Sequence, residues 1–260
     1  MAVSTGLTDK VLVDIEDAVM TVTINRPEVR NAVDRDVSYG VCAALDELDF
    51  RDDLRVGVLT GAGGTFCSGM DLKAFVRGEV TRVRERGIMG LARTPTAKPL
   101  IAAVEGFALA GGFEAMLACD LTVAARDARF GLPEVTRGLA AAAGGLLRLP
   151  RFVPPRVAMQ MALTGEHVDA EFLERHGLIN ELVEPGHALS AARALATRIA
   201  RNAPLAVAAS KRVILDQRNW ADDESFERQE QITGGLLTSA DAREGALAFA
   251  EKRAPVWQGR

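Results

Sequence analysis

The sequence predicts an α/β fold with a largely parallel sheet, followed by a helical C-terminal region. Between residues 55 and 125, short apolar strands alternate with glycine-rich loops and helical segments, a pattern typical of parallel strands joined by crossover helices. From about residue 154 onward the apolar periodicity is mostly helical. We therefore expect residues 1–199 to form an α/β core and residues 200–260 to form a helical region.

The first predicted elements are a β-hairpin and a helix. Residues 11–15 and 19–24 are short β-type runs, and in the second run apolar residues alternate with threonines. A helix is predicted at about 34–50, because its apolar residues fall on one stripe. Asp34 is the expected N-cap of this helix.

Two further strands each lead into a glycine-rich loop. The strands are predicted at 55–60 and 99–104, and the loops at 61–72 and 105–112. The charged segment between the first loop and the second strand, 73–97, is predicted to be helical. The remaining predictions are a helix at 113–119, strands at 121–125 and 178–183, and helices at 204–218, 222–237 and 241–252.

Composition and charge exclude several classes of protein. The 260 residues carry 31 basic and 35 acidic side chains, a net charge of −4, which does not suit a protein that binds nucleic acid. The three cysteines form no CxxC pair, so we expect reduced thiols. The first 30 residues are too charged for a signal peptide, and the longest apolar run has ten residues, whereas a membrane span needs about 20. We expect a cytoplasmic protein without a membrane partner.

Common catalytic and nucleotide-binding motifs are absent. The first glycine loop begins like GxGxxG but ends in Phe66, and Met70-Asp71 stand where a phosphate loop has Lys and Ser or Thr. The three histidines have no metal-binding spacing, and no GxSxG elbow occurs. The catalytic groups are therefore expected to be something other than His, Cys or a metal.

The glycine loops suggest an oxyanion hole. Both follow strands, and the second opens a helix, so that Gly111 and Gly112 present free N–H groups at the positive end of a helix dipole. Two N–H donors from separate loops that converge on one oxygen would each stabilise a transition state by roughly 3–4 kcal/mol.

Two glutamates lie near this expected hole. Glu114 is in the first turn of the helix, and Glu134 follows Pro133. The helix runs away for about 12 Å and the next strand returns by about 16 Å, which brings residues near 130 back to the start of the helix. Two carboxylates facing one water can serve as base and acid. The spacing also fits a Glu114 that only complements the helix dipole, or two glutamates on the surface.

The residues also resemble the crotonase (enoyl-CoA hydratase/isomerase) superfamily along nearly the whole chain, and the last residues look like those of carnitinyl-CoA dehydratases. The matching segments are RVGVLTGAGGTFCSGMDLKAF (55–75), KPLIAAVEGFALAGGFEAMLACDLTVAA (98–125), ARFGLPEV (128–135), GGLLRLPR (144–151), ALTGEHVDAEFLERHGLINELV (162–183) and FAEKR (249–253). The resemblance implies a spiral of ββα units with a helical C-terminal trimerisation region, and homotrimers or hexamers that act on acyl-CoA thioesters.

The resemblance also implies the site residues. The oxyanion hole falls on the backbone N–H groups of Met70 and Gly111, and the catalytic carboxylates on Glu114 and Glu134. No metal and no cofactor is implied, because coenzyme A is part of the substrate. The expected CoA-binding residues are Arg26, Cys67, Ser68, Asp71, Leu72, Lys73, Phe249 and Lys252.

The expected reaction is the reversible hydration of a trans-2-enoyl-CoA to a 3-hydroxyacyl-CoA, since both glutamates are present. By resemblance, Glu134 is the better candidate for the donor of the C2 proton, while the spacing alone does not order the pair. The alternatives are a dehydratase of a specialised acyl-CoA such as carnitinyl-CoA, an enoyl-CoA isomerase, and an acyl-CoA-binding scaffold without turnover.

Three positions depart from the superfamily pattern. Residues 138–145 replace a segment that usually contains proline, Ala110 stands where the hole loop often has glycine, and Glu105 stands where Asn or Asp is commoner. We expect the first and third departures to reshape the acyl pocket.

Overall fold

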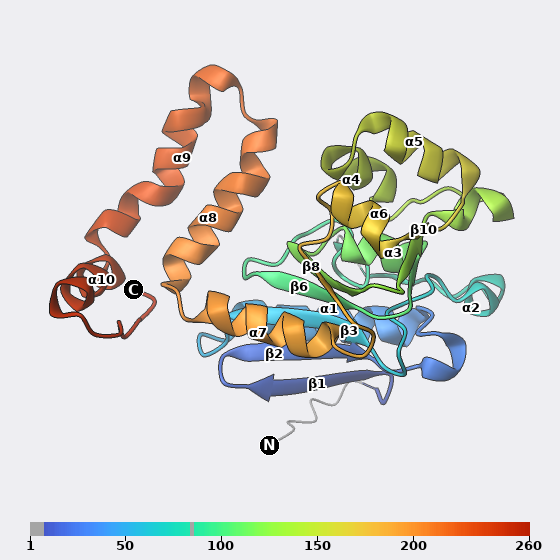
Figure 1. Ribbon diagram of the computed structural model, residues 1–260, viewed down its shortest axis with the longest axis horizontal. Coiled ribbons are helices and arrows are strands. Elements are labelled where there is room, and N and C mark those ends of the chain that lie inside the picture. The colour runs from blue at the N-terminus through green and yellow to red at the C-terminus, as the bar shows by residue number, and fades with distance from the viewer. Residues whose placement is uncertain (1–7, 84–85) are drawn as a thin grey trace.

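A six-stranded sheet forms the centre of the computed structural model, which describes residues 8–83 and 86–260. Its strand order is β1-β2-β3-β6-β8-β11, and every neighbouring pair is parallel except β1–β2 (Figure 1). The predicted α/β fold is confirmed. The strands are β1 (Val11–Glu16), β2 (Val19–Ile24), β3 (Val56–Gly61), β6 (Leu100–Val104), β8 (Leu121–Ala125) and β11 (Glu181–Val183).

The N-terminal hairpin and the first helix form as predicted. Val11 pairs with Ile24 across the β1–β2 hairpin. A short 3-10 helix, η1 (Pro27–Val29), precedes α1 (Arg35–Phe50). Asp34 caps α1, because its side chain accepts a hydrogen bond of 3.0 Å from the N–H of Val37.

Each face of the sheet carries its own apolar cluster, because successive residues of a strand point to opposite sides. In β6, Ala102 and Val104 pack in the cluster that contains α1. Ile101 and Ala103 pack on the other face, against a stripe of alanines on α7 (Ala188–Ala200). The parallel strands are therefore buried on both sides.

A smaller three-stranded sheet carries the turns on which the site is built. β7 (Phe107–Leu109) pairs in parallel with β9 (Arg129–Gly131), and β9 pairs antiparallel with β10 (Val168–Asp169). These strands have two or three residues each, too few to show an alternating pattern, so β7 was predicted as part of a loop. β6, β7 and α3 (Gly111–Met116) form one of the ββα units of the spiral.

The predicted helix at 73–97 is wrong. Only α2 (Leu72–Val76) is helical, and the two-residue strands β4 (Arg82–Val83) and β5 (Gly87–Ile88) follow it, with residues 84–85 outside the described part. Gly78 and Gly87 have φ of 79° and 82°, in the left-handed region that a right-handed helix does not contain.

Further helices lie between β9 and β11, grouped around α3 (Figure 1). The predicted strand at 178–183 is confirmed in its last three residues as β11. These helices are η3 (Pro133–Arg137), α4 (Gly145–Phe152), α5 (Pro155–Thr164) and α6 (Ala170–Arg175).

The C-terminal helices lean away from the sheet, and α10 lies at the opposite end of the molecule from α2 (Figure 1). All three predicted helices are present, although the second is α9 with a 3-10 turn on each side. None of the helices in the described part is long and apolar enough to cross a bilayer. The elements are α8 (Pro204–Asp216), η4 (Gln217–Asn219), η5 (Asp222–Glu224), α9 (Ser225–Thr233), η6 (Gly234–Thr238) and α10 (Ala240–Glu251).

Candidate active site

The two glutamates come from neighbouring turns. Leu109 at the end of β7 is paired with Gly131 at the end of β9, and the next residue, Ala110, donates its N–H to the carbonyl of Gly131 at 2.9 Å. Glu114 and Glu134 follow these two strand ends within a few residues. The return of the chain to the start of α3, expected from element lengths, is therefore observed.

Glu114 is a buried carboxylate held by backbone amides. Only 3% of the residue is exposed. Its Oε1 accepts hydrogen bonds of 2.7 Å from the N–H of Ala143 and 2.8 Å from the N–H of Gly145. Burial raises the pKa of Glu114, and the two N–H donors act in the opposite direction. The carboxylate is thus anchored to another segment and does not merely complement the dipole of α3.

Glu134 has a different environment. It lies in the first turn of η3, and its Oε2 is buried without a hydrogen-bond partner among the described residues. Burial raises the pKa of Glu134 to about 7, and the nearby charge of Glu114 acts in the same direction. Near neutral pH this carboxyl is therefore partly protonated, which suits a group that gives or takes a proton.

The expected hole amides lie beside each other. The N–H of Val33 binds the carbonyl of Gly69 at 2.8 Å, and the N–H of Asp71 binds the carbonyl of Val33 at 2.9 Å, so both neighbours of Met70 are fixed. A Cβ added to Gly111 would lie 3.8 Å from the nitrogen of Met70. The N–H groups of Met70 and Gly111 have no acceptor within the described residues, and both remain available for a ligand oxygen.

Ala110 sets the direction of the second amide. Its φ of 49° and ψ of −127° lie outside the regions that non-glycine residues ordinarily adopt, and such a conformation costs on the order of 1–3 kcal/mol. The hole loop therefore retains the conformation of a glycine although an alanine occupies the position. The next glycine is required, because a Cβ on Gly112 would lie 2.2 Å from the carbonyl oxygen of Cys67.

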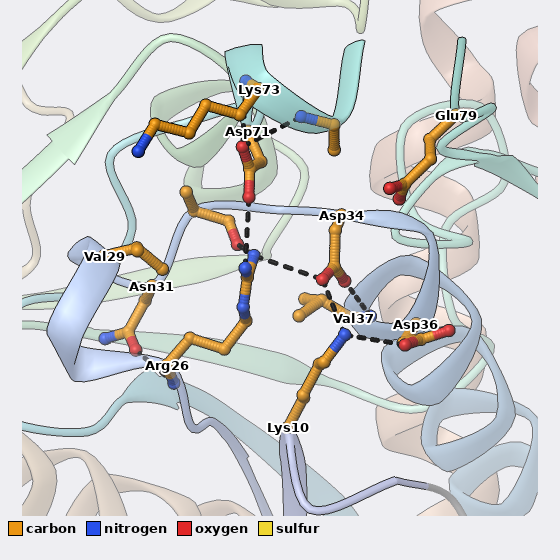
Figure 2. A network of polar contacts seen from close by, with 12 residues as sticks. Lys10, Arg26, Val29, Asn31, Asp34, Asp36, Val37, Asp71, Lys73 and Glu79 are labelled. Carbon is orange, nitrogen blue, oxygen red and sulfur yellow. Dashed lines mark hydrogen bonds and ion pairs between the residues drawn. The ribbon is translucent and has the colours of Figure 1, made fainter. Parts of the chain in front are cut away.

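Figure 2 shows a network of polar contacts in which Arg26 lies between Asp34 and Asp71, the residue that follows Met70. Arg26 lies within 3.0 Å of the Asp71 carboxylate and 3.3 Å of the Asp34 carboxylate, and it donates to the carbonyl of Ala32 at 2.5 Å. Asp71 also caps α2 by accepting from the N–H groups of Lys73 and Ala74. Burial opposes ionisation of Asp71, but its hydrogen bonds and Arg26 hold its pKa below the usual value.

This network bears on the expectation that Arg26 binds CoA. The Arg26 side chain is only 14% exposed and lies between two carboxylates. Its charge is thereby compensated, which leaves little attraction for a phosphate. The geometry assigns Arg26 and Asp71 to the support of the hole loop.

The other expected CoA-binding residues do not form one cluster in a single chain. The thiol of Cys67 is fully buried and accepts from the N–H of Gly69, so it has no surface for a ligand. Lys73 is exposed on α2, whereas Phe249 and Lys252 are exposed at α10, at the other end of the molecule (Figure 1). Ser68 is half-buried and Leu72 is exposed.

Two departures from the superfamily pattern, Glu105 and the segment 138–145, were expected to reshape the acyl pocket. The Glu105 side chain binds elsewhere. The Glu105 carboxylate accepts from the N–H of Ala188 at 2.9 Å and of Gly186 at 3.1 Å. It therefore caps α7 on the opposite face of the sheet, and that expectation is wrong. The segment 138–145 does reach the site, because its amides hold Glu114.

Sequence reasoning missed Ala143, Gly145 and Arg148. Arg148 donates to the carbonyl of Ala92 at 2.8 Å and lies 3.4 Å from the carbonyl of Ala143. The signal in the sequence is the glycine pair at 144–145, since Gly144 has φ of 105°. A residue in that conformation followed by a helix indicates a sharp turn with free N–H groups.

The large clefts lie elsewhere. One of about 800 Å³ runs between α8 and the body and is lined by Arg148, Phe152 and Lys211, among others. Another of about 420 Å³ is lined by Arg55, Lys98 and C-terminal residues. Neither contains the two glutamates or the hole amides. Among the described residues, no group of three or more His, Cys, Asp or Glu is arranged to hold a metal ion.

Comparison with known proteins gives consistent relatives. The chain is 41% identical over 254 residues to a carnitinyl-CoA dehydratase of Salmonella arizonae, covering 93% of this chain and 95% of that protein. It is 40% identical over 256 residues to an enoyl-CoA hydratase of Mycobacterium tuberculosis, covering 96% of each. The crystal structure of an enoyl-CoA hydratase of Mycobacterium marinum superposes with a TM-score of 0.96 at 55% identity, covering 97% of this chain and all of that one.

A family model that covers nearly the whole chain agrees with these relatives and with the fold. Residues 14–260 match the family described as enoyl-CoA hydratase/isomerase. The relatives align over nearly their whole length, so the resemblance seen in the sequence is confirmed. With its parallel sheet and its ββα spiral, the chain belongs to the enoyl-CoA hydratase/isomerase family, the crotonases.

Proposed function

We propose that the protein adds water reversibly across the double bond of a trans-2-enoyl-CoA. The observation that carries this proposal is the difference between the two carboxyls. Glu114 is held by two backbone amides, while Glu134 is half-buried, has a buried Oε2 without a hydrogen-bond partner among the described residues, and has a pKa of about 7. Addition of water needs one group that accepts a proton and one that gives a proton.

The hole amides would bind the thioester oxygen. When the N–H groups of Met70 and Gly111 donate to that oxygen, they stabilise the negative charge that develops as the enolate forms. Each such donor contributes about 3 kcal/mol to the transition state. These N–H groups stabilise the negative enolate oxygen more than the neutral thioester oxygen. They therefore lower the barrier to reaction rather than only strengthening the binding of the substrate.

The environments of the two glutamates support different roles for them. Glu114, with two N–H donors on one oxygen, would take a proton from water as the oxygen attacks C3. Glu134, partly protonated near pH 7, would give its proton to C2. One carboxyl gains a proton as the other loses one, so the pair keeps the same number of protons through the step. The substrate brings its own coenzyme A, and no further cofactor is part of this proposal.

A panel of thioesters tests the proposal. Loss of the enoyl-thioester absorbance is followed with crotonyl-CoA and longer trans-2-enoyl-CoA esters, and 3-hydroxyacyl-CoA esters are followed in the reverse direction. We expect turnover in both directions. Binding of these esters without turnover would instead indicate a scaffold, and migration of the double bond without hydration would indicate an isomerase.

A second candidate is dehydration of a specialised acyl-CoA of the carnitinyl-CoA type. It is favoured by the 41% identity to a carnitinyl-CoA dehydratase, and it would use the same carboxyls in the reverse sense. Carnitinyl-CoA therefore belongs in the panel. A kcat/KM for carnitinyl-CoA well above that for every simple 3-hydroxyacyl-CoA would select this second candidate.

We also propose that the protein works as a homotrimer or a hexamer. In one chain, α2, which contains Lys73, and α10 lie at opposite ends of the molecule (Figure 1). Phe249, Phe226 and Leu237 on the C-terminal helices are more than 80% exposed, which is unusual unless they are covered by another surface. Light scattering of the purified protein should give three or six times the chain mass of 27.8 kDa, and a monomer that hydrates crotonyl-CoA would contradict this.

A further inference from the structure

Arg148 is a half-buried cation near Glu114, the carboxylate that accepts from two backbone amides. It lies on α4, and its guanidinium donates to the carbonyls of Ala92 and, more weakly, Ala143. No carboxylate of the described residues lies within ion-pair distance of it. An arginine stays charged even when buried, so a positive charge without a paired anion faces this part of the site.

We propose that Arg148 is a positioning residue that holds the 143–145 turn around Glu114 and keeps Glu114 ionised, so that Glu114 acts as the base. The inference rests on the proposed function and deepens it, because it explains how two glutamates in one site take opposite roles.

The turn geometry supports the positioning role. Arg148 binds the carbonyl of Ala143, the residue whose N–H binds Glu114. A Cβ on Gly144 would lie 2.1 Å from the guanidinium nitrogen, so the arginine lies directly against that glycine. The guanidinium thus contacts both residues that precede Gly145, whose N–H is the second donor to Glu114.

The charges around Glu114 support the electrostatic role. Arg148, on α4, carries a positive charge close to Glu114. This charge favours the ionised form of the Glu114 carboxylate. Glu134 faces it from η3 with the same sign, and Arg137 lies nearer to Glu134. Arg151 and the thiol of Cys119 act on Arg148 itself. Removal of the Arg148 charge therefore shifts the balance toward protonation of Glu114, while the N–H groups of Ala143 and Gly145 still favour the ionised form.

Three variants separate charge from structure. Arg148→Gln removes the positive charge. Arg148→Lys keeps the charge but not the two guanidinium nitrogens that bind the carbonyls of Ala143 and Ala92. Arg151→Gln is the matched control, because Arg151 is exposed on the same helix and makes no contact with the 143–145 turn. The ionisation of Glu114 is read by NMR of 13C-labelled glutamate in the Glu134→Gln background, where one site carboxyl remains. Rates are read as kcat and KM against pH.

We expect Arg148→Gln to raise the pKa of Glu114 by at least about half a unit and to lower kcat at pH 7 by about tenfold or more, with little change in KM. The acidic limb of the kcat profile should move to higher pH by a similar amount. Arg148→Lys should restore the pKa and only part of kcat, and Arg151→Gln should change neither.

The inference is overturned if folded Arg148→Gln keeps the pKa and kcat of its parent. It is also overturned if Glu114, with Arg148 intact, stays protonated at pH 7, a measurement that needs no arginine variant. Absence of turnover by the wild-type protein on every ester would overturn the proposed function instead, and the pKa comparison would still decide the role of Arg148.

Discussion

The Arg26–Asp71 ion pair allows a test of whether buried charges hold the loop that contains Met70 in place. In Asp71→Asn the amide oxygen still caps α2, while the charge opposite Arg26 is lost. The two side chains are 14% and 13% exposed. Loss of one partner of a buried pair costs about 3–5 kcal/mol, but Arg26 keeps Asp34 and the carbonyl of Ala32, so we expect about 2 kcal/mol of lost unfolding free energy.

The effect on rate follows from the neighbouring residue. Asp71 adjoins Met70, whose N–H is a proposed hole donor, and complete loss of such a donor lowers kcat by about 10²–10³. A displaced donor retains part of its effect, so we expect kcat to fall about tenfold or more while KM changes little.

Urea unfolding and initial rates with crotonyl-CoA measure both effects. Arg77→Ala is the control, since Arg77 pairs with Glu79 on the exposed part of the same segment, and such exposed pairs contribute less than about 1 kcal/mol. The reasoning is refuted if Asp71→Asn raises KM with kcat unchanged, because that result would place the pair on the coenzyme A.

Three other predictions follow from the site and its supports. Glu134 is the proposed acid and has a pKa of about 7, so kcat for hydration should fall as pH rises above 7. Burial raises this pKa above the value in the unfolded chain, so ionisation of Glu134 opposes folding at high pH. Glu134→Gln should therefore raise Tm at pH 8 but not at pH 4. A Cβ on Gly145 would lie 3.0 Å from Cγ of Glu114, so Gly145→Ala should lower kcat about tenfold with KM nearly unchanged, and an unaltered kcat would contradict the role of this turn. Lys211 binds Asp120 at 2.6 Å and is 9% exposed, so Lys211→Met should lower the unfolding free energy by about 3 kcal/mol and expose α8 to limited proteolysis; wild-type resistance would show that the pair does not anchor α8.

The sequence predicted elements that have a clear apolar pattern. α1 has an apolar stripe, β2 alternates apolar residues with threonines, and β6 is a continuous apolar run that is buried on both faces. The strands β7 and β9 are too short for such a pattern, because three residues show no period. The segment 73–97 misled because its many charges are typical of an exposed helix, whereas its glycines at positive φ end any helix.

Element lengths predicted that the chain returns to the start of α3, which places Glu114 and Glu134 on neighbouring turns, but they did not predict what supports these side chains. The catalytic roles of the two glutamates came from the family resemblance and stay a prediction. The partners of these groups are backbone amides and carbonyls, such as those of Ala143 and Ala92, which leave no trace in residue type. Likewise, the sequence alone does not show that Arg26 pairs with two carboxylates, because one of them, Asp71, lies 45 residues away along the chain.

The most direct test of the account is the rate of hydration by Glu114→Gln and Glu134→Gln with saturating crotonyl-CoA. Loss of general acid or base catalysis lowers a rate by about 10²–10⁴, and we predict that each variant loses at least about 10² in kcat while both still bind the thioester. A wild-type kcat in either variant would contradict the assignment of the two carboxyls as base and acid.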